Sequence, residues 1–486
     1  MLGTKDILEA VKGRLMNGNP TAEFSDVSTD TRKIEKGSLF IAIKGPNFDG
    51  HDFIAKAVKK GASGAVVSRD IPPHLNPLPK GERKQDLKPS PLRGEGKGEG
   101  FIIIKVEDTV KALGDIAKFH RSRFDIPVIA LTGSNGKTTT KEMLALILSA
   151  KYNVLKNEGT ENNFIGVPQT LLKLNKGHDI AVVELGTNHF GEIAYLSDIV
   201  QPNCGMIINI GPSHLEFFGS VENVMKEKLD LLKRIGEDGS AIVNGDDDGL
   251  INDAKKMCEE VVTFGLNEGC DFMAGRIHES DCGINFALND TYLVKLRMLG
   301  KHNVYNALAA IAAGSLYGIA AGAAAKALED FVLPKLRMEY EKCDGIEFIF
   351  DCYNSNPASL KSAIGTLRDM EQGKVPPGRE KRRVMIAGDM LELGASGQEL
   401  HREIGRFAAK AGIDLFVSVG QLSRYILEGA QEEGIGGKSL LRFENSVEAA
   451  KALKDILRKG DLVLVKGSRG MKMEEIKKCF TTCSTR

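Results

Sequence analysis

The sequence lacks a net charge. Lysine and arginine together number 65, as do aspartate and glutamate, so the formal charge at pH 7 is zero. Proteins whose main partner is a nucleic acid usually carry a basic excess, because phosphate contacts dominate that affinity. We therefore expect no nucleic-acid partner. A phosphorylated small molecule needs only a few local charges and stays compatible with this composition.

Long apolar runs and paired cysteines are also missing. No stretch reaches the roughly 18–20 apolar residues that span a bilayer, and the first residues lack the basic and apolar blocks of a signal peptide. The eight cysteines form no Cys-x-x-Cys pair, and Cys479 and Cys483 are the closest two. Scattered cysteines in a long chain are typical of reduced thiols. We expect a soluble cytoplasmic monomer without membrane insertion.

What the sequence does contain is an alternation of apolar strands and amphipathic helices, in a chain of 486 residues. This alternation is typical of α/β folds with parallel sheets. We predict three α/β domains: residues 1–124, a central P-loop domain with a doubly wound parallel sheet at 125–333, and a smaller Rossmann-like domain at 334–486.

One stretch interrupts the first domain. Residues 72–100 are rich in proline, glycine and charge, and such a composition cannot bury enough apolar surface to offset the entropy lost on ordering. We predict a disordered insertion there, without a catalytic role. Its flanks, Gly64–Val67 and Phe101–Val106, are predicted to be neighbouring strands that need only a short turn between them.

A glycine-rich segment at residues 132–140, which we call the phosphate loop, follows the predicted strand Val128–Leu131 and precedes a predicted helix. Its sequence is Thr-Gly-Ser-Asn-Gly-Lys-Thr-Thr-Thr. Glycines let backbone amides wrap phosphate oxygens, and a helix N-terminus adds partial positive charge. Lys137 would neutralise terminal phosphates, and the Thr138 hydroxyl would hold magnesium. The predicted nucleotide-binding residues are Gly133, Ser134, Asn135, Gly136, Lys137, Thr138 and Thr139. A guanine-reading Asn-Lys-x-Asp motif is absent, which favours ATP.

Two more predicted strands end in residues that could bind a metal. Ile180–Val183 leads to Glu184, and Met206–Ile210 leads to Gly-Pro-Ser-His214. Ligands in doubly wound folds meet the carboxyl ends of strands, so a carboxylate and an imidazole there would suit a divalent metal beside the nucleotide. Each residue taken singly is equally compatible with a capped strand end.

Lys228 is unusual because it lies on the apolar stripe of the helix after His214, with Val221, Val224, Met225 and Leu232. Two interpretations stay open. The lysine stem could pack while the ammonium reaches water, or the ammonium could point into the active site.

Several of these motifs together resemble the Mur ligases, the ATP-dependent amide-forming enzymes of peptidoglycan synthesis. The motifs are the phosphate loop, Glu184-Leu-Gly, His214-Leu-Glu with Lys228, Gly300-Lys-His-Asn-Val-Tyr-Asn-Ala-Leu-Ala and Asp351-Cys-Tyr-Asn-Ser-Asn-Pro. The resemblance covers nearly the whole chain outside residues 71–100.

The resemblance implies roles for these positions. Thr138, Glu184 and His214 would hold magnesium, and Lys137, Lys228 and His214 would act in catalysis, with Lys228 carbamylated. Asn303 would contact adenine, and Arg337 and Asp351 would contact the nucleotide. The remaining residues that match substrate-binding positions are Thr31, Arg32, Thr160, Asn162, Asn163, Asn354 and Asn356.

Within the family, the segments 162–172, 353–359 and 387–394 are most similar to the member that joins D-alanyl-D-alanine to UDP-N-acetylmuramoyl-tripeptide. The Asp-Asn-Pro-Arg element of the diaminopimelate-adding ligase is missing. The alternatives are a sister ligase that adds diaminopimelate or lysine, a folate polyglutamating enzyme, or a P-loop switch or motor ATPase. A motor would hydrolyse ATP when nucleic acid or protein stimulates it, whereas a ligase needs an amine and a carboxylate.

Overall fold

The structure is a computed structural model that describes residues 2–71, 100–280, 283–370 and 381–481. The chain forms two compact units. The first unit comprises Met1–Ile126, Asn157–Asp179 and Asp198–Gln201, and the second comprises Pro127–Lys156, Ile180–Ser197 and Pro202–Arg486. The insertion predicted at residues 72–100 lies, except for Gly100, outside the described residues.

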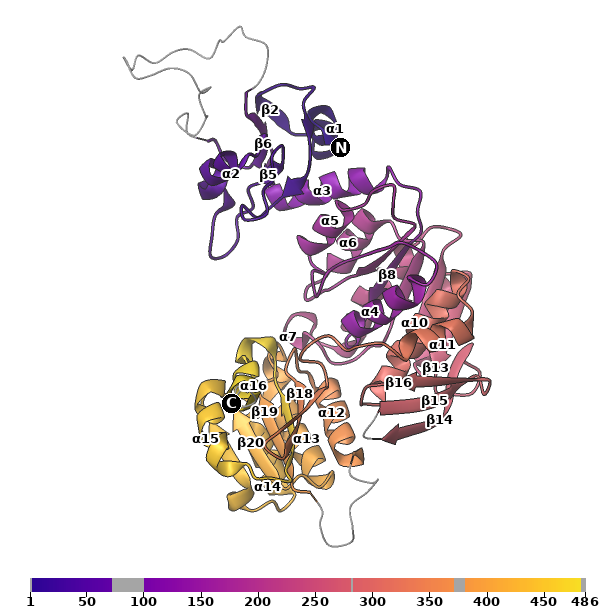
Figure 1. Ribbon diagram of the computed structural model, residues 1–486, viewed down its shortest axis with the longest axis vertical. Coiled ribbons are helices and arrows are strands. Elements are labelled where there is room, and N and C mark those ends of the chain that lie inside the picture. The colour runs from indigo at the N-terminus through magenta and orange to yellow at the C-terminus, as the bar shows by residue number, and fades with distance from the viewer. Residues whose placement is uncertain (1, 72–99, 281–282, 371–380, 482–486) are drawn as a thin grey trace, which may run out of the picture. The chain divides into compact units, whose positions relative to one another are not determined.

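The first unit is built on a five-stranded sheet (Figure 1). In sheet order its strands are β2 (Arg14–Asn17), β7 (Ile102–Lys105), β6 (Gly64–Val67), β5 (Leu39–Ile41) and β4 (Val27–Ser28). All neighbours are parallel except β2, which is antiparallel to β7. The short strands β1 (Leu2–Gly3) and β3 (Glu23–Phe24) pair separately. The helices are α1 (Thr4–Val11), α2 (Ile54–Lys60), α3 (Thr109–Arg121) and α5 (Gly166–Leu171).

Apolar side chains cover both faces of this sheet. Leu39 and Ile41 face a core that α1 and α3 cover, whereas Phe40 between them faces a second core with α2. Successive strand side chains point to opposite faces, so a continuous apolar strand is buried on both sides. This explains why β5 and β6 are apolar runs rather than alternating patterns.

The strands that flank the insertion are neighbours, as predicted, but the prediction of a short turn between them is wrong. β6 and β7 are parallel, with Gly64 opposite Ile102 and Val67 opposite Lys105. Parallel neighbours need a crossover connection that returns to the starting edge of the sheet. A short turn cannot make such a connection.

The second unit contains a nine-stranded sheet at its amino-terminal end. In sheet order its strands are β16 (Tyr292–Leu296), β15 (Gly283–Leu288), β14 (Phe272–Ser280), β13 (Glu260–Gly265), β12 (Ser240–Asn244), β11 (Cys204–Ile207), β8 (Val128–Thr132), β10 (Ile180–Glu184) and β9 (Val154–Lys156). β14, β15 and β16 pair antiparallel with one another, and the other pairs are parallel.

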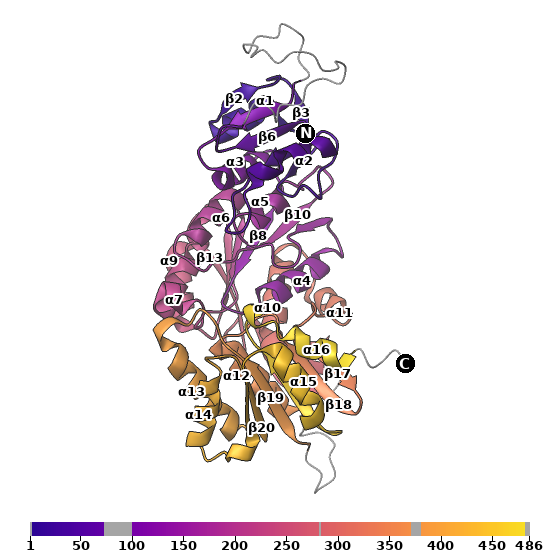
Figure 2. The same cartoon turned by 90° about the vertical axis from the view of Figure 1, so that its left-hand side faces the viewer.

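Helices cover both faces of this sheet, which confirms the doubly wound arrangement (Figure 2). α4 (Lys137–Leu148) and α10 (His302–Leu316) pack on one face, while α8 (Val221–Leu229) and α9 (Asp248–Met257) pack on the other. Further helices are α6 (Glu192–Val200), α7 (Leu215–Phe218) and α11 (Ala321–Leu328). α10 is rich in alanine because it packs closely on α4; a Cβ added at Gly314 would lie 2.7 Å from Ile147.

A six-stranded sheet follows in the same unit. Its order is β17 (Glu339–Cys343), β18 (Ile346–Asp351), β22 (Leu462–Lys466), β19 (Arg383–Gly388), β20 (Leu415–Val419) and β21 (Leu440–Phe443), and only β17 is antiparallel to its neighbour. α12 (Pro357–Asp369), α13 (Gly397–Lys410) and α14 (Arg424–Glu432) cover one face, and α15 (Ser446–Ile456) and α16 (Glu474–Thr481) cover the other. The predicted alternation of strands and helices is confirmed.

Candidate active site

The phosphate loop lies at the carboxyl end of β8 in the nine-stranded sheet. It follows β8, which lies between β10 and β11, and α4 begins at Lys137. After β8 the chain forms β9 and β10 on one side of it, and then β11 and β12 on the other. The end of β8 is therefore the topological switch point, where doubly wound folds bind ligands. Gly136 has φ = 80°, and a Cβ there would lie 2.2 Å from Asn306 Oδ1. The loop therefore requires glycine at this position.

Polar side chains from the neighbouring strand end hold the loop. The Asn135 amide donates to Asn209 Oδ1 (2.9 Å), and Asn209 Nδ2 donates back to the Asn135 carbonyl (3.0 Å). Ser134 Oγ donates to the Gly211 carbonyl and accepts from the Gly211 amide, both at 3.0 Å. Paired bonds of this kind fix the loop before any ligand arrives, so little entropy is lost on binding.

The first turn of α4 presents the predicted phosphate-binding side chains. Lys137 Nζ donates to the Gly133 carbonyl (2.7 Å), across the loop. Burial lowers the pKa of Lys137, an effect that the Glu184 carboxylate opposes and the Arg337 charge reinforces. Thr138 and Thr139 are both buried. The Thr138 hydroxyl accepts a hydrogen bond from Arg337 Nη2 (3.1 Å).

The structure brings the three predicted metal ligands to one edge of the sheet. Glu184 ends β10, where it is opposite Leu131 of β8, and its side chain is 1% exposed. His214 follows β11, the neighbour of β8 on the other side. It begins α7 in the left-handed conformation, with φ = 52°. A hydroxyl, a carboxylate and an imidazole thus follow three adjacent strands.

Lys228 is buried, at 2% exposure, on α8. The predicted apolar stripe is only partly correct, because Val221 is 36% exposed and Leu232 lies beyond the end of α8 in a short 3-10 turn. Burial, and then the positive charge of Lys137, hold the pKa of Lys228 well below its usual value, against the opposing charge of Glu227. The stem is packed, as both interpretations of Lys228 require, so the choice between them stays open.

Asn303 is a buried residue in the first turn of α10. It is 1% exposed, donates to the Leu299 carbonyl (2.8 Å) and accepts from Asn306 Nδ2 (3.0 Å). Asn306 Oδ1 in turn accepts from Thr140 of α4 (3.2 Å). This chain of amides fixes the start of α10 against the start of α4.

Two residues that flank the first strands of the six-stranded sheet contact the same loop. Arg337 donates to Thr138, and its guanidinium stacks on the Tyr353 ring at 4.2 Å. Asn356 Nδ2 donates to Asn135 Oδ1 (2.8 Å), while Asn356 Oδ1 accepts from Ser359 and begins α12. The structure therefore places two predicted third-domain residues directly on the phosphate loop.

Asp351 and Asn354 both contact Lys466. Asp351 Oδ2 lies 2.5 Å from the Lys466 ammonium, which also donates to the Asn354 carbonyl at 2.9 Å. Lys466 is 2% exposed. This buried lysine fixes the loop that follows β18, and with it the approach of Asn356 to Asn135.

Five of the predicted substrate-binding residues lie in the first unit, because Asn157–Asp179 joins Met1–Ile126 there; they are Thr31, Arg32, Thr160, Asn162 and Asn163. Gln169 Nε2 donates to Thr29 Oγ1 (2.5 Å) and ties these two segments together. Thr31 is buried, whereas Arg32 is exposed and paired with Asp30 at 2.8 Å. Asn163 Oδ1 accepts the amides of Ile165 and Gly166 before α5, and Thr160 and Asn162 lie just ahead of it.

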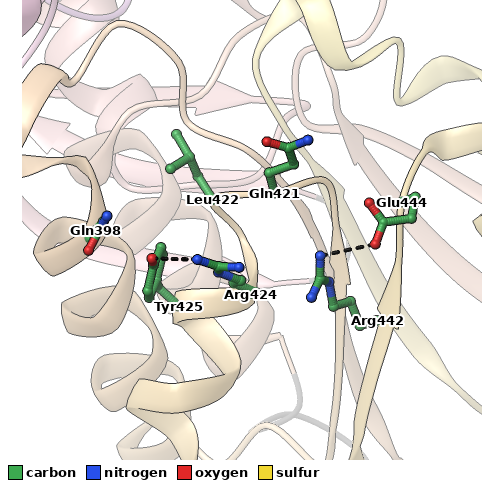
Figure 3. Close-up of a pocket in the computed structure, with 7 residues that line it drawn as sticks. All are labelled: Gln398, Gln421, Leu422, Arg424, Tyr425, Arg442 and Glu444. Carbon is green, nitrogen blue, oxygen red and sulfur yellow. Dashed lines mark hydrogen bonds and ion pairs between the residues drawn. The ribbon is translucent and has the colours of Figure 1, made fainter.

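A pocket of about 370 Å³ lies at the carboxyl ends of β20 and β21 (Figure 3). Its lining residues are Gln398, Gln421, Leu422, Arg424, Tyr425, Arg442 and Glu444. Arg424 donates to the Tyr425 hydroxyl (2.7 Å), and Arg442 pairs with Glu444 (3.0 Å). Asp389 accepts the backbone amides of Gln421 and Ser423, which fixes the loop after β20. The pocket is polar and carries two guanidinium groups.

Sequence reasoning missed several of these residues. Asn209 was assigned to the strand Met206–Ile210, but β11 ends at Ile207 and leaves Asn209 in the loop. Glu227 was also missed: it is 2% exposed and accepts the amides of Gly191 and Ile193, both at 2.8 Å. Its position beside Lys228 on a mostly apolar face was the available signal.

Within the described part of the chain, no group of three or more His, Cys, Asp or Glu side chains could hold a metal ion. No helix among the described residues is long and apolar enough to cross a membrane.

Comparison with known proteins gives matches along most of the chain. Residues 131–314 match the Mur ligase middle domain, residues 336–469 the Mur ligase glutamate ligase domain, and residues 23–121 the Mur ligase family catalytic domain. The chain is 37% identical over 482 residues (98% of this chain, 97% of the relative) to a UDP-N-acetylmuramoyl-tripeptide–D-alanyl-D-alanine ligase of Bacillus subtilis (strain 168).

Solved structures agree with these matches. A crystal structure of MurF from Acinetobacter baumannii has a TM-score of 0.83 and 34% identity, with 98% of each chain covered. MurF of Thermotoga maritima in complex with ADP has a TM-score of 0.77 and 26% identity, with 94% of this chain and 97% of that chain covered. The predicted three-domain α/β fold and the family resemblance are confirmed. The chain belongs to the Mur ligase family and is an ATP-dependent acid–amino-acid ligase.

Proposed function

We propose that this chain joins D-alanyl-D-alanine to UDP-N-acetylmuramoyl-tripeptide with ATP, and releases the pentapeptide, ADP and phosphate. The observation that carries this proposal is the phosphate loop at the switch point, which side chains of the six-stranded sheet, Arg337 and Asn356, contact directly. A ligase needs such an arrangement because the amine must reach the activated carboxylate beside the phosphates. The names of the MurF relatives supply the identity of the two substrates.

The chemistry requires activation of the carboxylate. Transfer of the γ-phosphoryl group breaks its bond to the ADP oxygen and forms a bond to a carboxylate oxygen, which gives an acyl phosphate. The amine nitrogen then attacks the carbonyl carbon, phosphate leaves, and the amine proton passes to solvent. The Lys137 ammonium, which here donates to the Gly133 carbonyl, would turn to the phosphates and neutralise the charge on the moving group.

The donor set of Thr138, Glu184 and His214 fits magnesium. Magnesium typically takes one or two carboxylates and keeps waters and phosphate oxygens as its other ligands. Glu184 supplies the one carboxylate of this set, and it is buried. Arg337 would have to release the Thr138 hydroxyl, to which it now donates. When bound, the metal would supply positive charge that stabilises phosphoryl transfer.

We propose that Lys228 becomes a carbamate, as the family resemblance implies. Carbon dioxide reacts only with the neutral amine, and burial together with the Lys137 charge lowers the pKa of Lys228 and favours that form. The carbamate is an anion, so the same side chain would then attract the ammonium of Lys137 instead of repelling it.

We place the incoming dipeptide between the pocket in Figure 3 and the phosphate loop. D-alanyl-D-alanine carries a free carboxylate, which suits the guanidinium groups of Arg424 and Arg442. Asp389 holds the loop of this pocket, and Glu392, three residues further on, contacts His214.

The Arg424→Gln variant tests this placement. The KM for D-alanyl-D-alanine should rise about tenfold, because a charge-assisted hydrogen bond is worth roughly 1.5–3 kcal/mol, while the KM for ATP stays unchanged. Arg458→Gln is the control, since Arg458 is exposed and precedes the amino end of β22, whereas the pocket lies at the carboxyl ends of β20 and β21. Equal KM values for the dipeptide in both variants would remove the pocket from the proposal.

We further propose that the first domain, residues 1–124, binds the UDP-muramoyl peptide, and that the other domains are 125–333 and 334–486. The three matched stretches support these borders, because each border falls between two of them. Thr31, Arg32, Thr160, Asn162 and Asn163 are candidates for this substrate because they share one compact unit.

Phosphate release tests the proposed function. Purified protein with ATP, magnesium and UDP-N-acetylmuramoyl-tripeptide should release phosphate continuously only after D-alanyl-D-alanine is added. Release with diaminopimelate or lysine on a dipeptide-bearing acceptor would instead indicate a sister ligase. Release without any amine, stimulated by protein or nucleic acid, would indicate a P-loop switch or motor.

A further inference from the structure

A second lysine of α4, which no motif explains, is completely buried beside the proposed metal ligands. The Lys141 side chain has 0% exposure, and its Nζ lies 3.2 Å from Glu142 Oε1 and 3.8 Å from Glu184 Oε2. Lysine is almost never fully buried unless it is paired, because removing its charge from water is costly. Its burial therefore points to a role for the charge.

The geometry sets Glu184 against two lysines of one helix. Lys137 and Lys141 are four residues apart on α4, which places them on the same helix face. The charge of the Glu184 carboxylate raises the pKa of Lys137 against the larger effect of burial, and the same carboxylate forms an ion pair with Lys141. Lys137 is partly exposed and can move to a nucleotide, whereas Lys141 has no exposed surface and must stay.

Glu142 also pairs with Lys156, whose side chain is 38% exposed. Together with Lys137, the cluster contains three lysines and two glutamates, of which Lys141 and Glu184 are the buried members. Removing one member of a buried pair leaves a charge that the protein interior cannot stabilise.

We propose that Lys141 is a positioning residue whose buried charge lies against Glu184, and that this fixed charge weakens the binding of free metal so that the cation enters with the nucleotide. This inference rests on the proposed role of Glu184 in the metal site. A positive charge beside the site repels a lone divalent cation, but the phosphates of a bound nucleotide outweigh that repulsion. Metal binding and nucleotide binding thereby become coupled.

Thermal unfolding of the full chain without nucleotide tests this inference, with magnesium chloride alone as the probe and sodium chloride at matched ionic strength as the reference. Lys141→Met removes the charge but keeps the chain length. Its Tm without metal should fall by about 4 °C or more, and magnesium should raise that Tm at concentrations that leave the native protein unchanged. Lys156→Met is the matched control: it removes a charge of the same cluster without touching Glu184, and its magnesium response should equal that of the native chain.

Two results would overturn the inference. If Lys141→Met lowers the Tm but responds to magnesium like the native chain, the lysine is merely structural. If its Tm without metal is unchanged, no charge compensation exists. Should Lys141→Met not fold, the double variant Lys141→Met/Glu184→Gln decides: it should fold and show no magnesium response, and a double variant that also fails to fold contradicts the pairing.

The proposed metal site is judged separately by Glu184→Gln alone. If this variant keeps the native magnesium dependence of phosphate release, the assignment of Glu184 to the metal fails. The Lys141–Glu184 pairing would still be measured by the Tm values of the single and double variants, so the two failures are distinguishable.

Discussion

His214 Nδ1 lies 2.5 Å from Glu392 Oε2, so a proposed metal ligand after β11 is held by a carboxylate from the loop after β19. The backbone joins the same two segments, because the Glu216 amide donates to the Glu392 carbonyl (3.1 Å). The hydrogen bond to His214 lowers the pKa of Glu392, which keeps it an acceptor. The imidazole therefore directs its other nitrogen, Nε2, elsewhere, and we propose that Nε2 faces the metal.

Removal of this carboxylate should weaken the metal site. A partner that orients a metal-binding histidine is worth about 10–100-fold in metal affinity. We expect Glu392→Ala to raise the magnesium concentration for half-maximal phosphate release by that factor. Glu399→Ala is the control, because Glu399 is an exposed, ion-paired glutamate of the same domain. An unchanged magnesium dependence in Glu392→Ala would show that the contact does not orient His214.

The Lys137→Ala variant should remove the charge that neutralises the transferring phosphoryl group. Loss of one preorganised donor to a developing charge typically costs about 100–1,000-fold in kcat. Phosphate release under saturating substrates measures the effect, and circular dichroism confirms folding. Lys255→Ala on the exposed face of α9 should retain native turnover. Near-native turnover of folded Lys137→Ala would refute its assignment to the phosphates.

Lys228→Ala should lose most activity if the lysine works as a carbamate. Short carboxylates such as acetate or propionate should restore part of it, because they can occupy the position of the lost anion. Lys226→Ala is the matched control, since Lys226 lies on the exposed face of the same helix. A loss that no carboxylate restores would argue for a packing role, and full activity without additives would exclude Lys228 from catalysis.

Replacement of residues 76–98 by a few glycine and serine residues should leave the Tm and the ligase activity nearly unchanged. The eight residues 68–75 and the new linker still suffice to return along β6, whose partner β7 is parallel. Loop closure costs only about 0.6 kcal/mol per doubling of length. Limited proteolysis of the native chain should cut first within 76–98. Insolubility or lost affinity for the uridine nucleotide would show that the segment is structural.

Local patterns were sufficient for the elements that are apolar on both faces. The strand Gly64–Val67 is predicted with the bounds that the structure shows, because a short apolar run between turn residues is typical of a strand buried on both faces. The antiparallel strands β14, β15 and β16 were missed. Their pairing depends on partners across the sheet, and exposed residues interrupt the apolar runs of β14 and β16.

Short motifs were sufficient to predict the α/β class, the phosphate loop and the family, because spacing within a motif encodes backbone conformation and ligand chemistry. How these motifs come together could not be predicted from them. Asn209, Asn306 and Arg337 reach the phosphate loop from distant parts of the sequence, and β6 is parallel rather than antiparallel to β7. Contacts between distant segments depend on how whole sheets pack, and burial of the Lys141–Glu184 pair is visible only once the helix lies on its sheet.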